Sequence, residues 1–423
     1  METAALIVVL VIALALFFDF TNGFHDTANA MATPIATGAL KPKTAVLLAA
    51  VLNLVGAFLS TEVARTISGG MIREDEISAT VFPSIIFAGL IGAITWNMLT
   101  WLLGLPSSSS HALFGGLIGA TLVGASAAAI NVGVVMSKVV LPALIAPLTA
   151  GIIAFTVTKL AYAMTRRYDS KPDGRDGFRW GQIFTSSLVA LAHGTNDAQK
   201  TMGVITLALI TVGWQSSDQP QLWVIFACAV TIALGTYMGG WRIIRTLGKG
   251  LTDVKPAQGF SAEASTASTI LASSALGFAL STTQVASGSV IGSGLGRRGS
   301  TVRWRTVGRI MIGWLLTLPA AGAVGALFAL IVVWLGQVVG VLVGAVAAVV
   351  IVLAIFLRSR RNEVNAANAM SEVAESGRAV KVKRNPPPTR RHRALLREQA
   401  ENEMTQTKDA TTGARADERK GDR

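Results

Sequence analysis

Apolar runs of about 20 residues recur along residues 1–357, and this pattern limits the possible folds more than any other feature of the chain. A run of that length, wound as an α-helix, is long enough to cross the hydrocarbon core of a bilayer. The composition agrees, because 14% of the residues are charged, whereas soluble proteins average about a quarter. We therefore predict an all-α polytopic membrane protein that crosses the cell (inner or plasma) membrane several times.

The positive charge of the chain lies where a membrane protein of this class carries it. Most of the net charge of +13 comes from short loops and from the segment after Leu357, as the positive-inside rule expects of the cytoplasmic side. We therefore predict no nucleic-acid partner. Residues 358–423 lack apolar periodicity and are rich in Arg, Lys and Glu, which predicts a basic, disordered cytoplasmic tail.

The cysteine and histidine content argues against a resident metal. The chain has one cysteine, Cys228, and four scattered histidines. A single cysteine excludes an intrachain disulfide and a Cys-based metal site, and four scattered histidines are too few for a multi-histidine centre. We predict no metal site of the chain's own and no cofactor.

Two polar clusters interrupt the apolar sequence and resemble each other. One covers residues 21–30 and the other residues 192–200, and aligning their glycines places Asp26 on Asp197. Ionisable groups at membrane depth cost kilocalories, so such a cluster marks a functional site by default. The structural alternative is a pair of buried polar caps at helix breaks.

A second pair of segments repeats in the same order. Residues 104–111 align with residues 277–284, and the glycines that follow each segment align as well. Each apolar piece after these Ser- and Thr-rich turns is too short to cross a bilayer alone, which favours a re-entrant hairpin. Two polar signatures in the same order indicate a duplicated unit, and interrupted apolar segments at matching places are typical of a transporter's binding site.

The duplication predicts the domain organisation. We expect two inverted-topology repeats, residues 1–165 and residues 181–357, joined by a hydrophilic linker at residues 166–180. Each repeat is expected to contain a broken helix and a re-entrant hairpin. In the first repeat, the Asn-Gly pair at residues 22–23 predicts the break.

Hydroxyl side chains gather at the tips of the two expected hairpins. A helix N-terminus presents unpaired N–H groups and the positive end of the helix dipole, which suits an oxyanion, and hydroxyls add donors without adding charge. Most Ser-rich turns are ordinary helix caps, but two of them paired with two aspartate clusters indicate an anion site. The candidate residues are Ser108, Ser109, Ser110, Ser281, Thr282 and Thr283.

On these residues the sequence resembles the inorganic phosphate transporter (PiT) family. The match rests on residues 22–30, residues 192–203 and the two hairpin tips, and it covers roughly residues 5–357. The resemblance implies a symporter with an inverted repeat that binds phosphate between the tips, through the six hydroxyl residues. It also implies coupling-cation and gating roles for Asp26, Asn29, Asn196 and Asp197, and we place His25, Lys200, His111 and Gln284 with them.

His25 departs from the sodium-coupled pattern of that family, which has Asn before the Asp. This form resembles the bacterial proton-coupled, low-affinity branch, whose members take up phosphate as a neutral complex with a divalent metal. Lys200 stands where the first cluster has Asn29, and its fixed charge disfavours a sodium ion there. We predict phosphate import by proton symport, with His25 and the two aspartates as the relay.

Three alternatives stay open from the sequence. The coupling cation could be sodium, and the cargo could be another tetrahedral oxyanion such as sulfate. An intramembrane enzyme that uses His25, Asp26 and a serine lacks a catalytic framework such as Gly-x-Ser-x-Gly or His-Glu-x-x-His, so we predict a transporter and no enzyme. The expected partners are phosphate, the coupling cation, a divalent metal carried with phosphate, and the lipid bilayer; a homodimer is left open.

Overall fold

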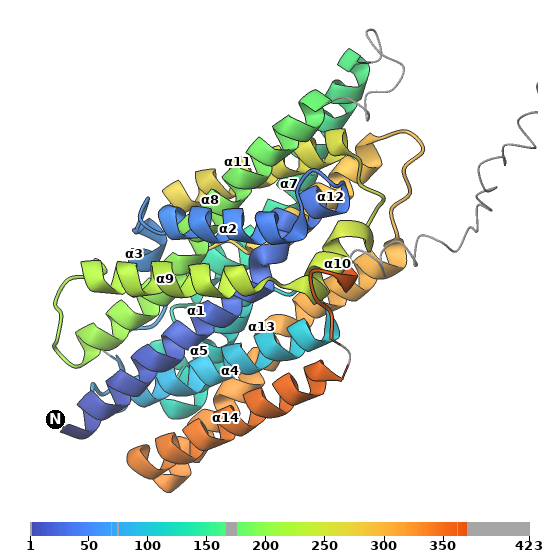
Figure 1. The fold of residues 1–423 in the computed structure, drawn as a ribbon. Coiled ribbons are helices and arrows are strands. Elements are labelled where there is room, and N and C mark those ends of the chain that lie inside the picture. The colour runs from blue at the N-terminus through green and yellow to red at the C-terminus, as the bar shows by residue number, and fades with distance from the viewer. Residues whose placement is uncertain (1, 69, 74–75, 166–175, 362, 370–423) are drawn as a thin grey trace, which may run out of the picture. The chain divides into compact units, whose positions relative to one another are not determined.

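The computed structural model describes residues 2–68, 70–73, 76–165, 176–361 and 363–369. Within these ranges the chain forms helices, turns and loops, and its only β-structure consists of two isolated bridges, Ile72 with Ile130 and Thr252 with Val302. The predicted all-α class is confirmed (Figure 1).

The helices follow one another along the chain with short connections. They are α1 (Glu2–Ala36), α2 (Pro42–Gly56), α3 (Glu62–Ser68), α4 (Phe82–Leu103), α5 (Ser109–Gly124), α6 (Val132–Val135), α7 (Leu141–Thr165), α8 (Asp176–Thr211), α9 (Leu222–Met238), α10 (Trp241–Lys249), α11 (Pro256–Ala275), α12 (Thr282–Gly296), α13 (Trp304–Leu335) and α14 (Gln337–Arg360). Two short non-α turns, η2 (Ala127–Ala129) and η3 (Met136–Val140), stand between α5 and α7.

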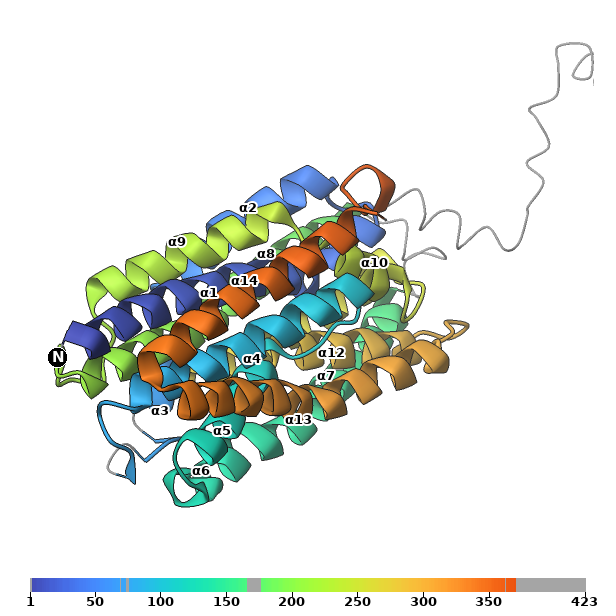
Figure 2. The same ribbon diagram turned by 90° about the horizontal axis from the view of Figure 1, so that it is seen from below.

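Five helical stretches are long and apolar enough to cross a membrane. They are Ala5–Ala36, Phe82–Leu103, Val132–Thr165, Trp304–Leu335 and Gln337–Arg360, and the pair α9 and α10, bent by 69°, would add a sixth. Figures 1 and 2 show α1, α4 and α14 side by side, with α9 along the other side of α1. The prediction of a multi-pass membrane protein is confirmed.

The predicted breaks in the helices that carry the two polar clusters are wrong. Both α1 and α8 run through their clusters without interruption. Gly23 and Gly194 serve helix contact instead. A Cβ on Gly23 would lie 2.4 Å from the carbonyl oxygen of Ile232 on α9, and a Cβ on Gly194 would lie 2.2 Å from that of Asn53 on α2. Glycine lets these backbones touch, as small residues do between helices in membranes.

Two helix–turn–helix hairpins stand where the sequence predicted them. The first joins α4 to α5 through residues 104–108, and the second joins α11 to α12 through residues 276–281. Gly104 and Gly277 follow the first arms with φ of 64° and 69°, a left-handed conformation that glycine adopts without steric cost. Ser108 and Ser281 are the N-caps of the second arms.

The second arms of the two hairpins pack in matching ways. On α5, a Cβ at Gly115 would lie 2.3 Å from the carbonyl oxygen of Leu318 on α13; on α12, one at Gly288 would lie 2.3 Å from that of Pro147 on α7. Both partner helices contain an internal proline, Pro147 in α7 and Pro319 in α13. This correspondence agrees with a duplicated unit, whose inverted orientation stays a prediction.

The expected domain boundaries fall partly outside the described residues. Of the linker predicted at 166–180, residues 166–175 are not described and residues 176–180 already belong to α8. Of the predicted tail, residues 358–360 complete α14, and residues 370–423 lie beyond the described part. The division into repeats and the character of the tail therefore stay predictions.

Candidate functional site

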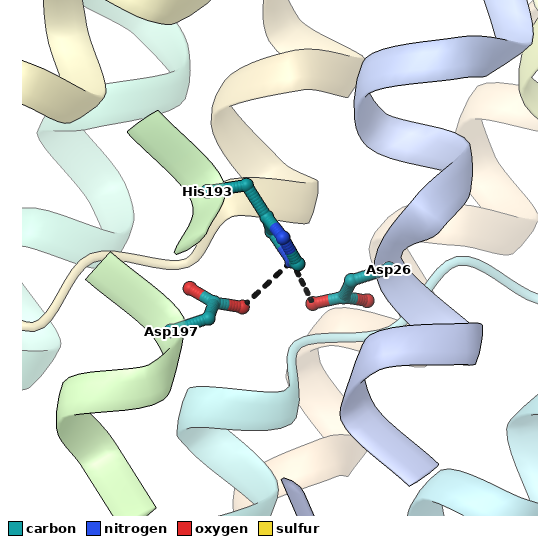
Figure 3. A group of neighbouring side chains, drawn as sticks. All are labelled: Asp26, His193 and Asp197. Atoms are coloured by element: carbon teal, nitrogen blue, oxygen red, sulfur yellow. Dashed lines mark ion pairs between the residues drawn. The ribbon is translucent and has the colours of Figure 1, made fainter. Parts of the chain in front are cut away.

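The packing of α1 against α8 brings the two aspartate clusters together. His193 on α8 lies between the carboxylates of Asp26 and Asp197 (Figure 3). Its Nε2 atom is 3.1 Å from Asp197 Oδ2 and 4.0 Å from Asp26 Oδ2. All three side chains are buried. Two carboxylates that are 171 positions apart in the sequence thus meet at one enclosed place.

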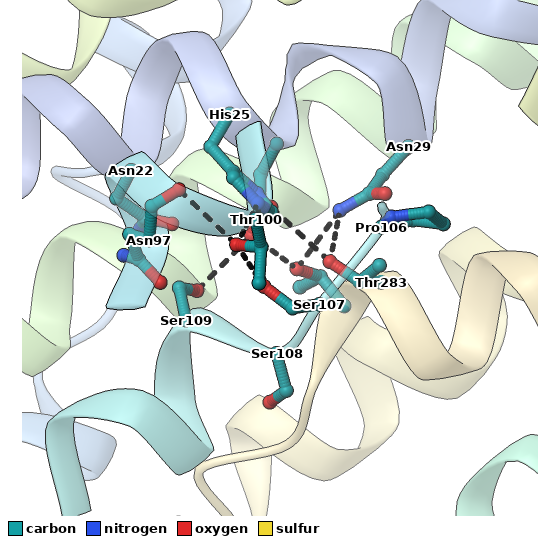
Figure 4. A network of polar contacts seen from close by, with 12 residues as sticks. Asn22, His25, Asn29, Asn97, Thr100, Pro106, Ser107, Ser108, Ser109 and Thr283 are labelled. Carbon is teal, nitrogen blue, oxygen red and sulfur yellow. Dashed lines mark hydrogen bonds and ion pairs between the residues drawn. The ribbon is translucent and has the colours of Figure 1, made fainter. Parts of the chain in front are cut away.

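The hydroxyls of both hairpin tips face these carboxylates. Ser109 Oγ donates to Asp26 Oδ2 at 3.1 Å, and Thr283 Oγ1 donates to Asp26 Oδ1 at 3.1 Å (Figure 4). Thr282 Oγ1 lies 3.4 Å from Asp26 Oδ2 and 3.3 Å from Asp197 Oδ2, within reach of either acceptor. Each hairpin therefore ends against the aspartates, and we name this buried group of hydroxyls and carboxylates the polar centre.

The remaining predicted hydroxyls hold the tips in shape. Ser110 Oγ donates to the backbone oxygen of Leu280 at 2.9 Å, which joins the first tip to the second. Ser108 accepts a bond from the backbone N–H of His111 at 3.1 Å, and Ser281 accepts one from that of Gln284 at 3.3 Å. These two serines act as N-caps, which satisfy N–H groups that the helix itself leaves unpaired.

His25 connects Asp26 to the first hairpin. Its Nδ1 atom lies 2.6 Å from Asp26 Oδ1, and its Nε2 atom lies 3.3 Å from both Thr100 Oγ1 and Ser107 Oγ. The two hydroxyls are themselves 2.7 Å apart. Although neighbouring residues on an intact helix point in different directions, the imidazole folds back onto the adjacent carboxylate. The relay role predicted for His25 stays a prediction.

Lys200 gives Asp197 a different partner. Lys200 Nζ donates to Asp197 Oδ1 at 2.7 Å, and the side-chain amide of Asn196 donates to the same oxygen at 2.7 Å. The lysine side chain is completely buried. In the first cluster, the matching residue is Asn29, whose amide donates to Thr283 Oγ1 at 3.0 Å. The polar centre therefore holds two carboxylates and one ammonium group, with two imidazoles beside them.

His111 and Gln284 face each other between the two hairpins. Gln284 Nε2 lies 3.5 Å from His111 Nδ1, and both side chains are buried. Each follows the cap of its own hairpin by three residues, so the pair joins the first turns of α5 and α12. In this structure the two residues link the hairpins and make no contact with Asp26 or Asp197 that would assign them to coupling.

Several residues of the polar centre were not predicted. His193 precedes Asp197 by four residues, and Asn22 precedes Asp26 by four, so each pair shares a helix face. That spacing could have identified both. Asn22 donates to Asp197 Oδ2 at 3.3 Å, across to the other cluster. Asn53, which lies 3.2 Å from His193 Nδ1, stands in the apolar stretch of α2, and only the tertiary structure places it here.

Glu263 ties α11 to the helices of the polar centre. Its carboxylate accepts bonds from Thr33 on α1, from Gln182 on α8 at 3.2 Å and from Thr185 on α8 at 2.9 Å. It is buried, with both oxygens paired. These three bonds join α11 to α1 and α8 beyond Asn29.

Asp26, His193 and Asp197 are also spaced closely enough to hold a cation. One ligand atom from each lies within 4.8 Å of the others. Asp197, however, is already neutralised by Lys200, and Asp26 already accepts hydroxyl bonds from both hairpins. Both carboxylates of this group therefore already have protein partners.

The profile of the phosphate transporter family matches residues 22–325, which include both aspartate clusters and both hairpins. A "Probable low-affinity inorganic phosphate transporter" of Mycobacterium tuberculosis strain H37Rv is 55% identical over 346 residues, covering 81% of this chain and 82% of its own. A protein of the same description from Bacillus subtilis strain 168 is 41% identical over 332 residues, covering 77% of this chain and 97% of its own.

A solved structure described as a sodium-dependent phosphate transporter has the same fold. It superposes with a TM-score of 0.69 at 22% identity, covering 78% of this chain and all of its own. At that identity the likeness concerns the fold alone. The family match and the bacterial relatives carry the assignment, and the relatives are transporters and not enzymes. The chain is thus a multi-pass membrane transporter that belongs to the phosphate transporter family.

Proposed function

We propose that this protein is a secondary active transporter that imports inorganic phosphate by symport with protons. The observation that carries the proposal is the direct contact of the hairpin hydroxyls with Asp26 and Asp197. Phosphate keeps a P–OH group near neutral pH, which can donate to a carboxylate while its other oxygens accept from hydroxyls and helix N-termini. Sulfate has no such proton, so carboxylates at the site favour phosphate over sulfate.

The charges of the polar centre support a proton as the coupling ion. Lys200 neutralises one of the two carboxylates, and an added phosphate would leave the buried group with excess negative charge. A buried uncompensated charge is costly, so loading requires added positive charge. The His25 ring beside Asp26 offers a place for it, because histidine is the side chain that ordinarily changes charge near neutral pH.

Lys200 also argues against sodium in the second cluster. Its ammonium group lies 2.7 Å from Asp197, a position where a sodium ion would otherwise find a carboxylate ligand. The alternative of sodium coupling is favoured by the description of the structural neighbour as sodium-dependent, although that likeness concerns the fold. Proton coupling predicts uptake that a pH gradient drives without sodium, and sodium coupling predicts uptake that requires a sodium gradient.

The same charge argument bears on the form of the cargo. A neutral complex of phosphate with a divalent metal would add no negative charge to a buried site that already holds two carboxylates. We extend the proposal to this form, as the likeness to the proton-coupled branch suggested. Uptake of phosphate should then rise with the concentration of Mg²⁺, and the labelled metal should enter together with phosphate.

The experiment is uptake of labelled phosphate into proteoliposomes that contain the purified protein. A pH gradient, acid outside, and a sodium gradient are imposed in separate assays, with sulfate as the competitor. We expect the pH gradient alone to drive accumulation and sulfate to compete poorly. If uptake requires sodium, the coupling ion is sodium and proton coupling is contradicted. If sulfate competes as well as phosphate does, the proposed selectivity for phosphate is contradicted.

A further inference from the structure

A third buried aspartate lies on the same face of α1 as Asp26. Asp19 precedes Asp26 by seven residues, nearly two full helical turns, and Asn22 stands between them on the same stripe. The Asp19 side chain is completely buried. Neither of its carboxylate oxygens has a hydrogen-bond partner among the described residues, and the same holds for the side-chain oxygen of Asn22. Every oxygen of Asp26, Asp197 and Glu263 has a partner, so Asp19 stands apart.

The ionisable groups that face Asp19 come from two neighbouring helices. His193 lies 4.0 Å from Asp26 and Asn22 bonds Asp197, so α8 runs antiparallel to α1, and its next turn brings Lys200 to the level of Asp19. On α9, Ile232 lies against Gly23 and the backbone of Thr236 accepts a bond from Thr27, so Cys228, one turn earlier, comes to the same level. The sequence of α4, which also packs on α1, contains no ionisable side chain. Other charged groups lie further along α1 towards its C-terminus.

Those more distant charges belong to four helices. Glu263 of α11 reaches α1 at Thr33. The helix α10, which carries Arg242 and Arg245, meets α1 from Phe24 to Ala32. The remaining cations of these helices are Lys249 at the end of α10, Lys43 in the first turn of α2, and Arg358 and Arg360 in the last turn of α14, and α12 contributes none. Beyond these helices, Arg179 of α8 donates to the backbone oxygen of Gly38, past the C-terminus of α1. Lys200 is thus the cation that faces Asp19.

An unpaired carboxylate in a membrane interior is costly, so Asp19 needs either a proton or a cation. In this structure the ammonium of Lys200 bonds Asp197 at 2.7 Å, which leaves the proton for Asp19. Lys200 therefore has two carboxylates as neighbours: it bonds Asp197, and Asp19 is without a hydrogen-bond partner in the described part of the chain. A long, flexible lysine side chain can exchange one for the other by rotation about its own bonds.

We propose that Asp19 carries the coupling proton and that Lys200 alternates between Asp197 and Asp19; this inference rests on the proposed proton symport. In the state described here, Lys200 pairs with Asp197 and Asp19 is a neutral acid. In the other state, the Asp19 O–H bond breaks, the proton passes to a water molecule, and the ammonium moves to the Asp19 carboxylate. The two states differ by one proton, and Lys200 stays charged in both. When Lys200 leaves, Asp197 keeps His193 and the amides of Asn22 and Asn196 as partners.

The test uses Asp19→Asn, which imitates the protonated acid and cannot release a proton. In proteoliposomes loaded with unlabelled phosphate and without gradients, exchange of labelled phosphate should stay within a few-fold of wild type. Accumulation driven by a pH gradient should fall to the external concentration. Asp19→Glu should restore part of it. The matched control is Thr158→Val, which removes another buried, unpartnered polar side chain, on α7, and should accumulate phosphate as wild type does.

The outcomes separate this inference from the proposed function. If wild type accumulates phosphate with the pH gradient and Asp19→Asn does the same, the role of Asp19 is overturned and proton symport stands. If wild type ignores the pH gradient, both are overturned. A folded Asp19→Asn protein that loses exchange together with accumulation would place Asp19 in phosphate binding and would also overturn its role as proton carrier.

Infrared difference spectra give a readout that does not depend on transport. Addition of phosphate to wild type should change the C=O stretching band of a protonated carboxyl group, and the Asp19→Glu variant should shift that band. Cys228 is the sole cysteine of the chain and lies on α9 at the level of Asp19, so its S–H stretch offers a second band that needs no label. A phosphate response with neither band affected by Asp19→Glu would overturn the inference, even where Asp19→Asn fails to fold.

Discussion

The two aspartate clusters share a sequence pattern but differ in what neutralises their carboxylates. On α1, Asp26 is met by the His25 ring at 2.6 Å and by hydroxyls of both hairpins. On α8, Asp197 is met by the ammonium of Lys200 at 2.7 Å. A lysine that is paired with a carboxylate keeps its charge. An imidazole, as a residue type, can take up or release a proton near neutral pH. The comparison teaches that two similar sequence patterns can give their carboxylates different electrostatic partners, because Lys200 stands where the first cluster has Asn29.

The division of roles extends along the two helices. The groups that we assign to proton movement, Asp19, His25 and Asp26, all lie on α1. The fixed positive charge lies on α8. Thr282, from the second hairpin, lies within hydrogen-bond distance of both carboxylates and so contacts both clusters.

The largest expected effect concerns the fixed charge of the second cluster. Lys200→Met leaves Asp197 buried without its ammonium, and breaking a buried ion pair in this way costs about 3–5 kcal/mol of stability. Thermal unfolding of the purified protein in detergent should show a large loss. The double variant Lys200→Met, Asp197→Asn should recover part of it, and Asn29→Leu, at the matching place in the first cluster, should cost less. Equal stability of Lys200→Met and wild type would break the comparison.

The second effect concerns the hydroxyls that face the carboxylates. Ser109→Ala and Thr282→Ala each remove a donor to a charged group, which contributes about 1.5–3 kcal/mol, or roughly tenfold or more in half-saturation concentration. Initial rates of phosphate uptake should show this for the double variant. Ser108→Ala, which removes a cap hydroxyl, is the control and should keep the affinity of wild type. A double variant with wild-type kinetics would remove the hairpin tips from the phosphate site.

A smaller effect should separate the two histidines. His25→Asn removes the ring bonded to Asp26, and uptake should then respond more weakly to acidification of the outside. His193→Asn removes a ring from the side of Asp197, where Lys200 supplies a constant charge, so its pH profile should stay closer to wild type. The measurement is the initial rate of uptake as a function of external pH. A flattened profile for His193→Asn with a normal one for His25→Asn would reverse the assignment.

The smallest expected effect is the loss of stability when an N-cap serine is removed, and it should be the same for α5 and for α12. Ser108 and Ser281 cap equivalent helices through equivalent backbone N–H groups. Replacing either by alanine should cost about 1 kcal/mol, the usual value for a lost N-cap. Thermal unfolding of the two single variants compares them directly. A large difference between them would mean that one serine does more than cap its helix.

Residue type and spacing were sufficient to predict the polar centre in outline. The candidate residues Asp26, Asp197, Ser109, Thr282 and Thr283 and the two hairpin turns follow from polar residues repeated in the same order within apolar sequence, whereas the contact between the two aspartate clusters does not. These signals survive in a sequence because polar groups at membrane depth are costly and therefore rare. The structure adds which hydroxyls face the carboxylates and which cap a helix. Ser109 donates to Asp26 and Ser108 caps α5, and the sequence does not distinguish these two neighbouring serines.

The continuity of α1 and α8 could not be read from the chain. An Asn-Gly pair favours a turn in local terms, and Gly23 was interpreted in that way. Its real partner is the backbone of α9, and a contact between distant helices leaves no local signal. The same holds for Asn53 and Thr100, whose contacts with His193 and His25 join distant helices and leave no pattern in the sequence of α2 or α4.

The most direct test of proton symport follows the pH inside proteoliposomes when phosphate enters. A pH-sensitive dye is trapped in the lumen, phosphate is added outside without sodium or an imposed pH gradient, and sulfate and the Ser109→Ala, Thr282→Ala variant serve as controls. We predict that phosphate acidifies the lumen, because each phosphate arrives with a proton, and that neither control does so. A lumen that keeps its pH, or that becomes alkaline only when sodium is present, would contradict proton coupling.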